Sequence, residues 1–220
     1  YTKEPYLHNG ELAWRDAPEQ SLDTDVMRGV EDPFDVTGGL KTLSGNLGRS
    51  VIKVSSVKPE HRYVKAEAVV FEDQNDVIDA FKRKELNRDA IVVVRNQGAH
   101  SIGMPELHKL TPTLGLLQSQ GYKVALVTDG RMSGASGKVP AAIHLSPEAA
   151  KGGMIAKLKT GDMLELDAEK GTLECLNIEE VAQREVLASE VAGSFGVGRE
   201  LWNRIRPLVT ESEEGASFII

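Results

Sequence analysis

The sequence predicts an α/β fold in which a mixed, barrel-like sheet is flanked by helices. Two short runs rich in β-branched residues, 90–94 and 123–128, are typical of strands that are buried on both faces. A helical segment separates them, and a strand–helix–strand unit of this kind forms a right-handed parallel crossover. Further strand patterns outnumber the helical ones in the middle of the chain. This excess favours a barrel-like mixed sheet over a plain doubly wound one.

Residues 1–45 lack a sustained hydrophobic period. Pro5, Pro18 and Pro33 interrupt them, and Gly38-Gly39 closes them. Proline and glycine are the strongest local breakers of regular structure. We therefore expect an extended arm or linker that wraps a neighbouring part of the protein.

Residues 46–177 are predicted to form the main domain. Helical spacing predicts helices over 76–86 and 105–120, the second with Pro105 in its first turn and Gly121 after its end. Alternating or continuous apolar residues predict the remaining strands, which include the two arms of a hairpin. These strands are 50–54, 63–71, 139–145, 163–167 and 172–176.

The rest of the chain is predicted to be helical. A short helix is expected to begin at Ser146-Pro147-Glu148, with the serine as N-cap, and to end at Gly152-Gly153. Residues 178–220 contain two amphipathic segments, 178–191 and 199–209. We expect both helices to pack on the main domain.

The composition excludes several classes of protein. The chain has 220 residues, with 26 Lys and Arg against 33 Asp and Glu, and a net charge of −7. This balance argues against non-specific nucleic-acid binding, and no apolar run approaches the ~20 residues of a membrane span. The single cysteine, Cys175, excludes a disulfide framework and a self-contained Cys-rich metal site, and we expect it in the core. We expect a soluble, cytoplasmic protein, and the start at Tyr1 rather than Met suggests a fragment or a trimmed chain.

Two loops each follow one of the buried strands, RNQGAHSIGMPE (95–106) and TDGRMSGASGK (128–138). Ligands collect at the carboxyl ends of such strands, and parallel neighbours would bring the two loops side by side. The glycines of the second loop can turn backbone N–H groups toward an anion, and Arg131 or Lys138 could pair with a carboxylate or phosphate. An ordinary glycine-rich connection is an equally good interpretation.

Three residues of these loops are candidates for chemistry. Ser133 becomes a base or nucleophile only if a metal, a cation or a base activates its hydroxyl, and otherwise it is a turn residue. Glu106 would be a hard oxygen ligand for magnesium or manganese, or a carboxylate favoured by the dipole of the predicted helix. Asp129 is most simply a turn-forming residue.

Three segments resemble the C-terminal part of the dihydroxy-acid/6-phosphogluconate dehydratase family. They are TDGRMSGASGKVPAAIHLSPEA (128–149), GMPE (103–106) and GGLKTLSGNLG (38–48), and the resemblance covers most of residues 34–176 in the same order. Within the family, SGASGKVPAAIHLSPEA is similar to the 6-phosphogluconate branch, because branched-chain enzymes tend to carry phenylalanine in place of Met132. The resemblance implies a swivelling β-barrel with helices.

The family removes water from a 2,3-dihydroxy acid to give a 2-oxo-3-deoxy acid. An iron–sulfur cluster takes the leaving hydroxyl, and a divalent metal holds the carboxylate end of the substrate. The resemblance therefore implies that Ser133 is the base that abstracts the proton and that Glu106 is a ligand of Mg²⁺ or Mn²⁺. The residues implied to shape the substrate-binding loop are Asp129, Gly130, Arg131 and Gly134.

The resemblance also implies that this chain holds half of an active site. The cluster, which we expect to be 4Fe–4S, would be bound by cysteines of the family's N-terminal part, because Cys175 lies outside the family motifs. The implied partners are that N-terminal cluster-binding domain, a second copy in a homodimer and a sugar-acid phosphate. The expected function is the C-terminal half of a hydro-lyase that converts 6-phospho-D-gluconate to 2-dehydro-3-deoxy-6-phospho-D-gluconate in the Entner–Doudoroff pathway. The alternatives are a branched-chain 2,3-dihydroxy acid or another sugar acid as substrate, and a non-catalytic anion-binding or docking module.

Overall fold

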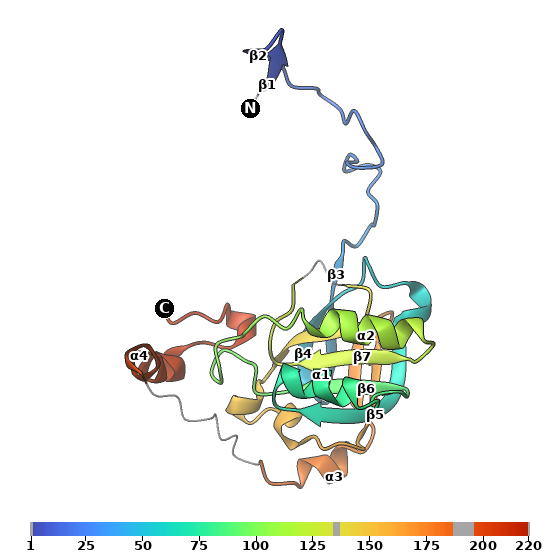
Figure 1. Cartoon of the computed structure of the whole chain (residues 1–220), viewed down its shortest axis with the longest axis vertical. Helices are drawn as coiled ribbons and strands as arrows, with labels where there is room; N and C mark the ends of the chain where they lie inside the picture. The colour runs from blue at the N-terminus through green and yellow to red at the C-terminus, as the bar shows by residue number, and fades with distance from the viewer. Residues whose placement is uncertain (1, 134–136, 187–195, 220) are drawn as a thin grey trace. The chain divides into compact units, whose positions relative to one another are not determined.

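A computed structural model describes residues 2–133, 137–186 and 196–219 (Figure 1). The chain divides into two compact units, Tyr1–Gly38 and Gly39–Ile220. Within the described ranges, no helix is both long enough and apolar enough to cross a membrane.

The first unit contains a β-hairpin that the sequence analysis did not predict. Strands β1 (Lys3–His8) and β2 (Glu11–Asp16) pair antiparallel. The two turn residues, Asn9 and Gly10, have φ angles of 52° and 85°. Positive φ at both positions is the requirement of a two-residue type I′ hairpin turn, and Asn-Gly is the sequence that meets it best. Part of the expected arm therefore has regular secondary structure.

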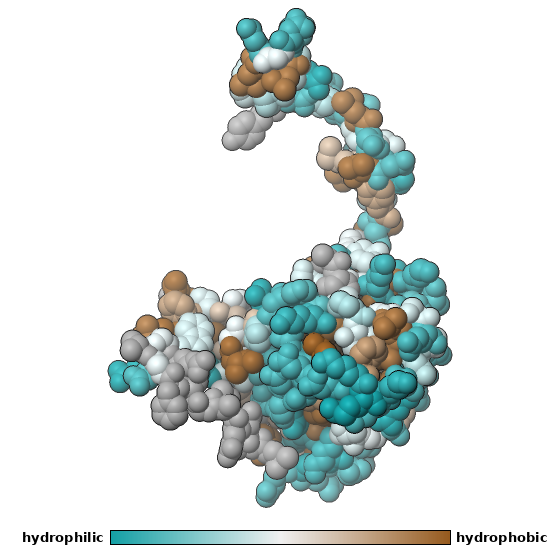
Figure 2. Space-filling model, viewed as in Figure 1, coloured by the Kyte–Doolittle hydropathy of each residue, from teal (hydrophilic) through white to brown (hydrophobic). Residues whose placement is uncertain are grey.

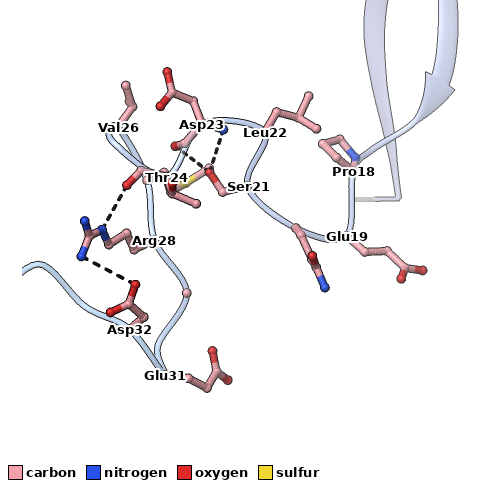
Figure 3. Close-up of a pocket in the computed structure, with 13 residues that line it drawn as sticks. Pro18, Glu19, Ser21, Leu22, Asp23, Thr24, Val26, Arg28, Glu31 and Asp32 are labelled. Carbon is pink, nitrogen blue, oxygen red and sulfur yellow. Dashed lines mark hydrogen bonds and ion pairs between the residues drawn. The ribbon is translucent and has the colours of Figure 1, made fainter.

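The hairpin is followed by an irregular loop that folds on itself (Figure 3). Arg28 Nε donates a hydrogen bond to the carbonyl oxygen of Thr24 at 3.1 Å, and its guanidinium lies 3.6 Å from the Asp32 carboxylate. Residues of this loop alone, from Pro18 to Asp32, line a cavity of about 740 Å³. None of the candidate site residues lies in this segment, so the cavity has no part in the site described below.

The second unit is built around a closed barrel, which confirms the predicted α/β class with a mixed barrel-like sheet (Figure 1). Its strand order is β10-β3-β4-β8-β7-β6-β5-β9, with parallel pairing from β5 through β6 and β7 to β8. Strand β3 lies within residues 1–45, which were expected to be an arm. The barrel strands are β3 (Leu40–Gly45), β4 (Gly48–Lys53), β5 (Tyr63–Phe71), β6 (Ala90–Val94), β7 (Val124–Thr128), β8 (Ala141–Ser146), β9 (Met163–Asp167) and β10 (Thr172–Cys175).

Two apolar clusters sandwich the parallel strands. Ile91 and Val93 of β6 point into the barrel, whereas Val92 and Val94 point outward. The outward residues pack against α1 (Gln74–Lys82) and α2 (Leu110–Ser119), which cover this side of the barrel in Figure 1. Both faces of the strand are therefore buried, which explains its continuous run of β-branched residues. Hydrophilic side chains dominate the barrel surface that Figure 2 shows.

Helix α2 begins later than predicted. The sequence placed Pro105 in its first turn, but the helix begins at Leu110. An isolated β-bridge between Glu106 and Arg131 holds the intervening backbone instead, and the Leu107 N–H donates to the Arg131 carbonyl oxygen at 3.2 Å. Glu106 is therefore not in the first turn of a helix.

Three elements near the C-terminus also differ from prediction. Ser146 is the last residue of β8, and its hydroxyl donates to Glu211 at 2.8 Å instead of capping a helix. The helix expected up to Gly152-Gly153 is replaced by a 3₁₀ turn, Ala149–Lys151. Helix α3 covers Ile178–Ala182 and α4 covers Val197–Ile205, so both are shorter than expected. The predicted helical residues 187–191 lie outside the described part of the chain.

Candidate active site

The two candidate loops lie side by side, as predicted. Strands β6 and β7 are parallel and in register, with Val94 opposite Thr128, so both loops leave the same edge of the sheet. The loops are then joined directly, because Glu106 and Arg131 form a parallel bridge. Arg131 adds a side-chain contact, in which its Nε donates to the Met104 carbonyl oxygen at 2.7 Å.

Glu106 and Ser133 meet at the end of this bridge. The Glu106 Oε1 atom accepts the backbone N–H of Ser133 at 2.7 Å and that of His108 at 3.1 Å. The other carboxylate oxygen, Oε2, lies 4.0 Å from Nη1 of Arg131. The Glu106 side chain is 30% exposed. Its carboxylate therefore reaches solvent while it holds the backbone of Ser133.

A cavity of about 770 Å³ opens beside this pair. Its lining comes from the end of the first loop, the first turns of α2 and the second loop. The lining residues are Glu106, His108, Thr111, Pro112, Gly115, Ser133 and Lys138. A cavity of this size accommodates a small sugar acid or its phosphate ester.

The cavity includes residues that the sequence analysis did not assign to the site. His108 was expected inside the helix over 105–120, but it precedes α2 in the structure, and Thr111 and Gly115 carried no sequence signal beyond their helical position. Lys138 lines the same cavity as Ser133. The sequence analysis had named it as a possible partner of an anion from its residue type alone.

Asp129 lies beneath the loops and is fully buried. Its carboxylate accepts three backbone N–H groups, from Gln97 at 2.9 Å, Ala149 at 2.9 Å and Asn96 at 3.2 Å. Burial raises the pKa of Asp129 to about 6, in spite of these three donors. The side chain thus joins the starts of both loops to the turn after β8, and it does not line the cavity.

Gly130 is buried beside Asp129 for a steric reason. A Cβ atom at this position would lie 2.6 Å from the Cβ of Gln97 in the neighbouring loop. The close approach of the two loops therefore requires glycine here. Arg131 is exposed at the edge of the site, and Gly134 lies outside the described residues.

The donor set at the cavity fits one part of a magnesium or manganese site. A carboxylate oxygen is the ligand type that these hard cations prefer, and Oε2 of Glu106 accepts no hydrogen bond among those found in the described residues. No group of three or more His, Cys, Asp or Glu side chains in the described ranges could hold a metal ion. Glu106 can thus supply one ligand, and the remainder would have to come from water, substrate or another part of the protein.

The residues of this chain do not fit an iron–sulfur cluster. Such clusters are held by several cysteine thiolates, and the sequence contains one cysteine. Cys175 is buried in the barrel core, where desolvation raises the pKa of its thiol. Its burial confirms the expected core position.

Comparisons with known proteins identify relatives along nearly the whole chain. A model of the family described as dihydroxy-acid/6-phosphogluconate dehydratase C-terminal matches residues 25–216. The chain is 55% identical to a phosphogluconate dehydratase of Helicobacter pylori, over 98% of this chain and 36% of that protein. It is 51% identical to a phosphogluconate dehydratase of Escherichia coli, over 100% of this chain and 37% of that protein.

A more distant relative carries a different name. The chain is 36% identical to a dihydroxy-acid dehydratase of Wolinella succinogenes, over 92% of this chain and 36% of that protein. The chain thus spans little more than a third of the length of the curated relatives that it matches. These matches confirm the resemblance seen in the sequence motifs. The chain belongs to the dihydroxy-acid/6-phosphogluconate dehydratase family and corresponds to its C-terminal part.

Proposed function

We propose that this chain is the C-terminal part of a cytoplasmic hydro-lyase that dehydrates 6-phospho-D-gluconate to 2-dehydro-3-deoxy-6-phospho-D-gluconate. Relatives named phosphogluconate dehydratase are 49–55% identical to it, whereas a relative named dihydroxy-acid dehydratase is 36% identical. This difference supports the sugar-acid phosphate over a branched-chain dihydroxy acid. The reaction would place the protein in the Entner–Doudoroff pathway.

The reaction requires two events at neighbouring carbon atoms. The C–H bond next to the carboxylate breaks and gives its proton to a base, and the C–O bond of the adjacent carbon breaks and releases hydroxide. The resulting enol takes up a proton at the carbon that lost hydroxide and gives up its hydroxyl proton, so that it becomes the 2-oxo product and one molecule of water is lost overall. A bound divalent metal would supply Lewis-acid chemistry at the carboxylate end of the substrate.

In this scheme Ser133 is the proposed base and Glu106 has two proposed roles. Its Oε1 atom orients the Ser133 backbone through the 2.7 Å hydrogen bond, and Oε2 is the proposed metal ligand. Arg131 and Lys138 would provide positive charge beside the substrate's anionic groups. Asp129 and Gly130, being buried, would shape the loop without touching the substrate. The observation that carries the proposal is the meeting of Ser133 and Glu106 at one cavity.

The remaining components are proposed to lie outside this chain. An iron–sulfur cluster would be bound by an N-terminal domain of the same protein, and two copies would form a homodimer. Iron analysis of the purified 220-residue chain should find no bound cluster, and the chain alone should not turn over 6-phosphogluconate. Stoichiometric iron and sulfide in this chain would contradict the division of the active site.

The base is tested in a protein that includes the other segments found in the relatives. Ser133→Ala should abolish turnover of 6-phosphogluconate and the exchange of the C2 proton with deuterated solvent, while cluster content stays intact. Ser119→Ala, at an exposed serine of α2 that does not line the cavity, is the matched control and should retain activity. Near-normal proton exchange in Ser133→Ala would eliminate it as the base. Efficient turnover of a branched-chain dihydroxy acid, with none of 6-phosphogluconate, would instead overturn the proposed substrate.

A further inference from the structure

A second polar cavity, of about 370 Å³, lies away from the candidate active site. It is an open cavity lined by the loop after β6, the 3₁₀ turn Ala149–Lys151, and the end of α4 with the 3₁₀ turn Arg206–Leu208 that follows it. Three of its six lining residues are basic, although the chain as a whole carries a charge of −7. The lining residues are His100, Ala150, Lys151, Asn203, Arg206 and Pro207, none of which lines the Glu106–Ser133 cavity.

His100 lines this cavity with a largely buried imidazole ring. Its side chain is 6% exposed, and neither ring nitrogen has a hydrogen-bond partner among the described residues. Nδ1 lies 3.3 Å from the buried carboxylate of Glu148, which also accepts the His100 backbone N–H at 2.9 Å. The opposite ring nitrogen, Nε2, is a buried polar atom that can take part in a hydrogen bond and has no partner among the described residues.

Arg206 leaves a donor unused. Its Nη1 donates to the Ser101 carbonyl oxygen, and its Nη2 donates to Oδ1 of Asn203 at 2.5 Å. These bonds fix the plane of the guanidinium, but the buried Nε–H has no partner among the described residues. Lys151 adds a second positive charge from an exposed position at the rim. Buried donors without acceptors are rare in proteins, and each such group calls for an explanation.

The nearby carboxylates do not neutralise this cluster. Glu148 pairs with His100, and Glu211 is engaged by the Ser146 hydroxyl at 2.8 Å and the Glu148 N–H at 3.4 Å. Neither carboxylate lines the cavity. Glu148 can lie this close to the loop because residue 98 is glycine, where a Cβ atom would be 2.3 Å from Glu148 Oε2. Arg206 and Lys151 therefore give the lining of the cavity two positive charges.

We propose that this cavity binds the phosphate group of a phosphorylated metabolite. A phosphate monoester is close to dianionic at neutral pH, and its oxygen atoms can accept hydrogen bonds from several donors at once. The charges of Arg206 and Lys151 match that of the phosphate, and the Nε–H of Arg206, the Lys151 ammonium and the His100 ring offer polar atoms to its oxygens. The metabolite is either the sugar-acid phosphate of the proposed reaction, extended to this cavity, or a separate phosphorylated compound. The first possibility rests on the proposed function, whereas the second does not.

Binding of inorganic phosphate to the 220-residue chain tests the site without any assay of turnover. Titration at low ionic strength, followed by ¹⁵N chemical shifts of the histidine rings, should show saturable binding that shifts the His100 signals. Arg206→Met should weaken binding at least about tenfold, and Lys151→Met several-fold, because each removes a charge-assisted contact. Arg204→Met and Lys159→Met each remove one positive charge from an exposed residue outside the lining, and both should bind phosphate within about twofold of the original chain.

Two further arms identify the source of the phosphate. 6-Phosphogluconate should displace inorganic phosphate, and gluconate should not. If one substrate molecule spans both cavities, Lys138→Met in the active-site cavity weakens 6-phosphogluconate but leaves inorganic phosphate unchanged. If the ligand is a separate compound, Lys138→Met changes neither affinity. Absence of saturable phosphate binding would refute the site, as would binding that Lys151→Met leaves unchanged, since this exposed substitution does not threaten the fold.

Discussion

Asparagine in place of Asp129 should change how the stability of the barrel depends on pH. The carboxylate is fully buried, and burial raises its pKa from 3.8 to about 6. Between these two values the folded chain binds more protons at this group than the unfolded chain does, so stability falls as pH rises through the window. At about 1.4 kcal/mol per pKa unit, the full penalty is about 3 kcal/mol, of which about 2 kcal/mol accrues between pH 4.5 and 7.5.

Asp129→Asn cannot titrate, so its stability relative to the original chain should rise by about 2 kcal/mol from pH 4.5 to 7.5. The substitution also lowers the free energy of unfolding by about 1–3 kcal/mol at every pH. This loss arises because the amide nitrogen of asparagine would face one of the three N–H donors. Because the loss is the same at every pH, it cancels when the two values are compared. The negative charge of Glu148, which raises the pKa of Asp129 further, is present in both proteins.

The measurement is urea unfolding at several pH values, followed by far-UV circular dichroism. Tryptophan fluorescence would not report on the barrel, since Trp14 lies in β2 and Trp202 in α4. Asp76→Asn, at an exposed carboxylate of α1, controls for the loss of one negative charge. The reasoning would be refuted if the stability of Asp129→Asn relative to the original chain stayed constant or fell as pH rises. Burial would then not raise the pKa of Asp129.

Two further substitutions test contacts that hold the same unit together. Arg184→Met should destabilise the chain by about 3–5 kcal/mol in urea unfolding. Arg184 donates two hydrogen bonds to the Asp162 carboxylate, which is 4% exposed, so removing the guanidinium leaves a buried carboxylate without its ion-pair partner. A loss below about 1 kcal/mol would mean that Asn177 and the Lys159 N–H suffice for Asp162. Gly98→Ala should lower the melting temperature, since its Cβ would lie 2.3 Å from Glu148 Oε2, whereas Gly115→Ala in α2 meets nothing within 4 Å and should leave it equal or higher. Equal effects of the two alanines would contradict the described packing of Glu148.

The barrel strands and the meeting of the two loops could be predicted because their signals are local. Residues 63–71 and 90–94 were predicted with the bounds that β5 and β6 have in the structure. Parallel pairing then follows from the helix that separates β6 from β7, and it brings Arg95 and Asp129 to one edge of the sheet. The Asn9-Gly10 turn is also a local hairpin signal, but the expectation of an arm was based on the prolines and did not use it.

The contacts that define the candidate site could not be predicted, because they depend on tertiary pairing. Pro105 followed by Glu106 has the pattern of a helix start, yet the backbone of Glu106 pairs with Arg131 across the sheet edge. Local propensity is a weak preference, and a bridge between two loops overrides it. The burial of Asp129 has the same origin, since its three N–H donors come from segments 20 to 33 residues away.

The geometry around Ser133 also indicates what a functioning site still needs. A serine hydroxyl does not remove a proton from carbon unless a neighbouring group lowers its pKa. Glu106, although adjacent, carries negative charge and uses Oε1 to hold backbone N–H groups, so it cannot serve in that way by itself. The positive charge must come from Arg131, from Lys138 or from a cation held at Oε2 of Glu106. Only the last of these would act on the hydroxyl and the substrate carboxylate together. If the proposal is correct, Glu106→Gln should therefore retain the loop geometry, because an amide oxygen can still accept both N–H groups, and should lose metal-dependent proton exchange at C2.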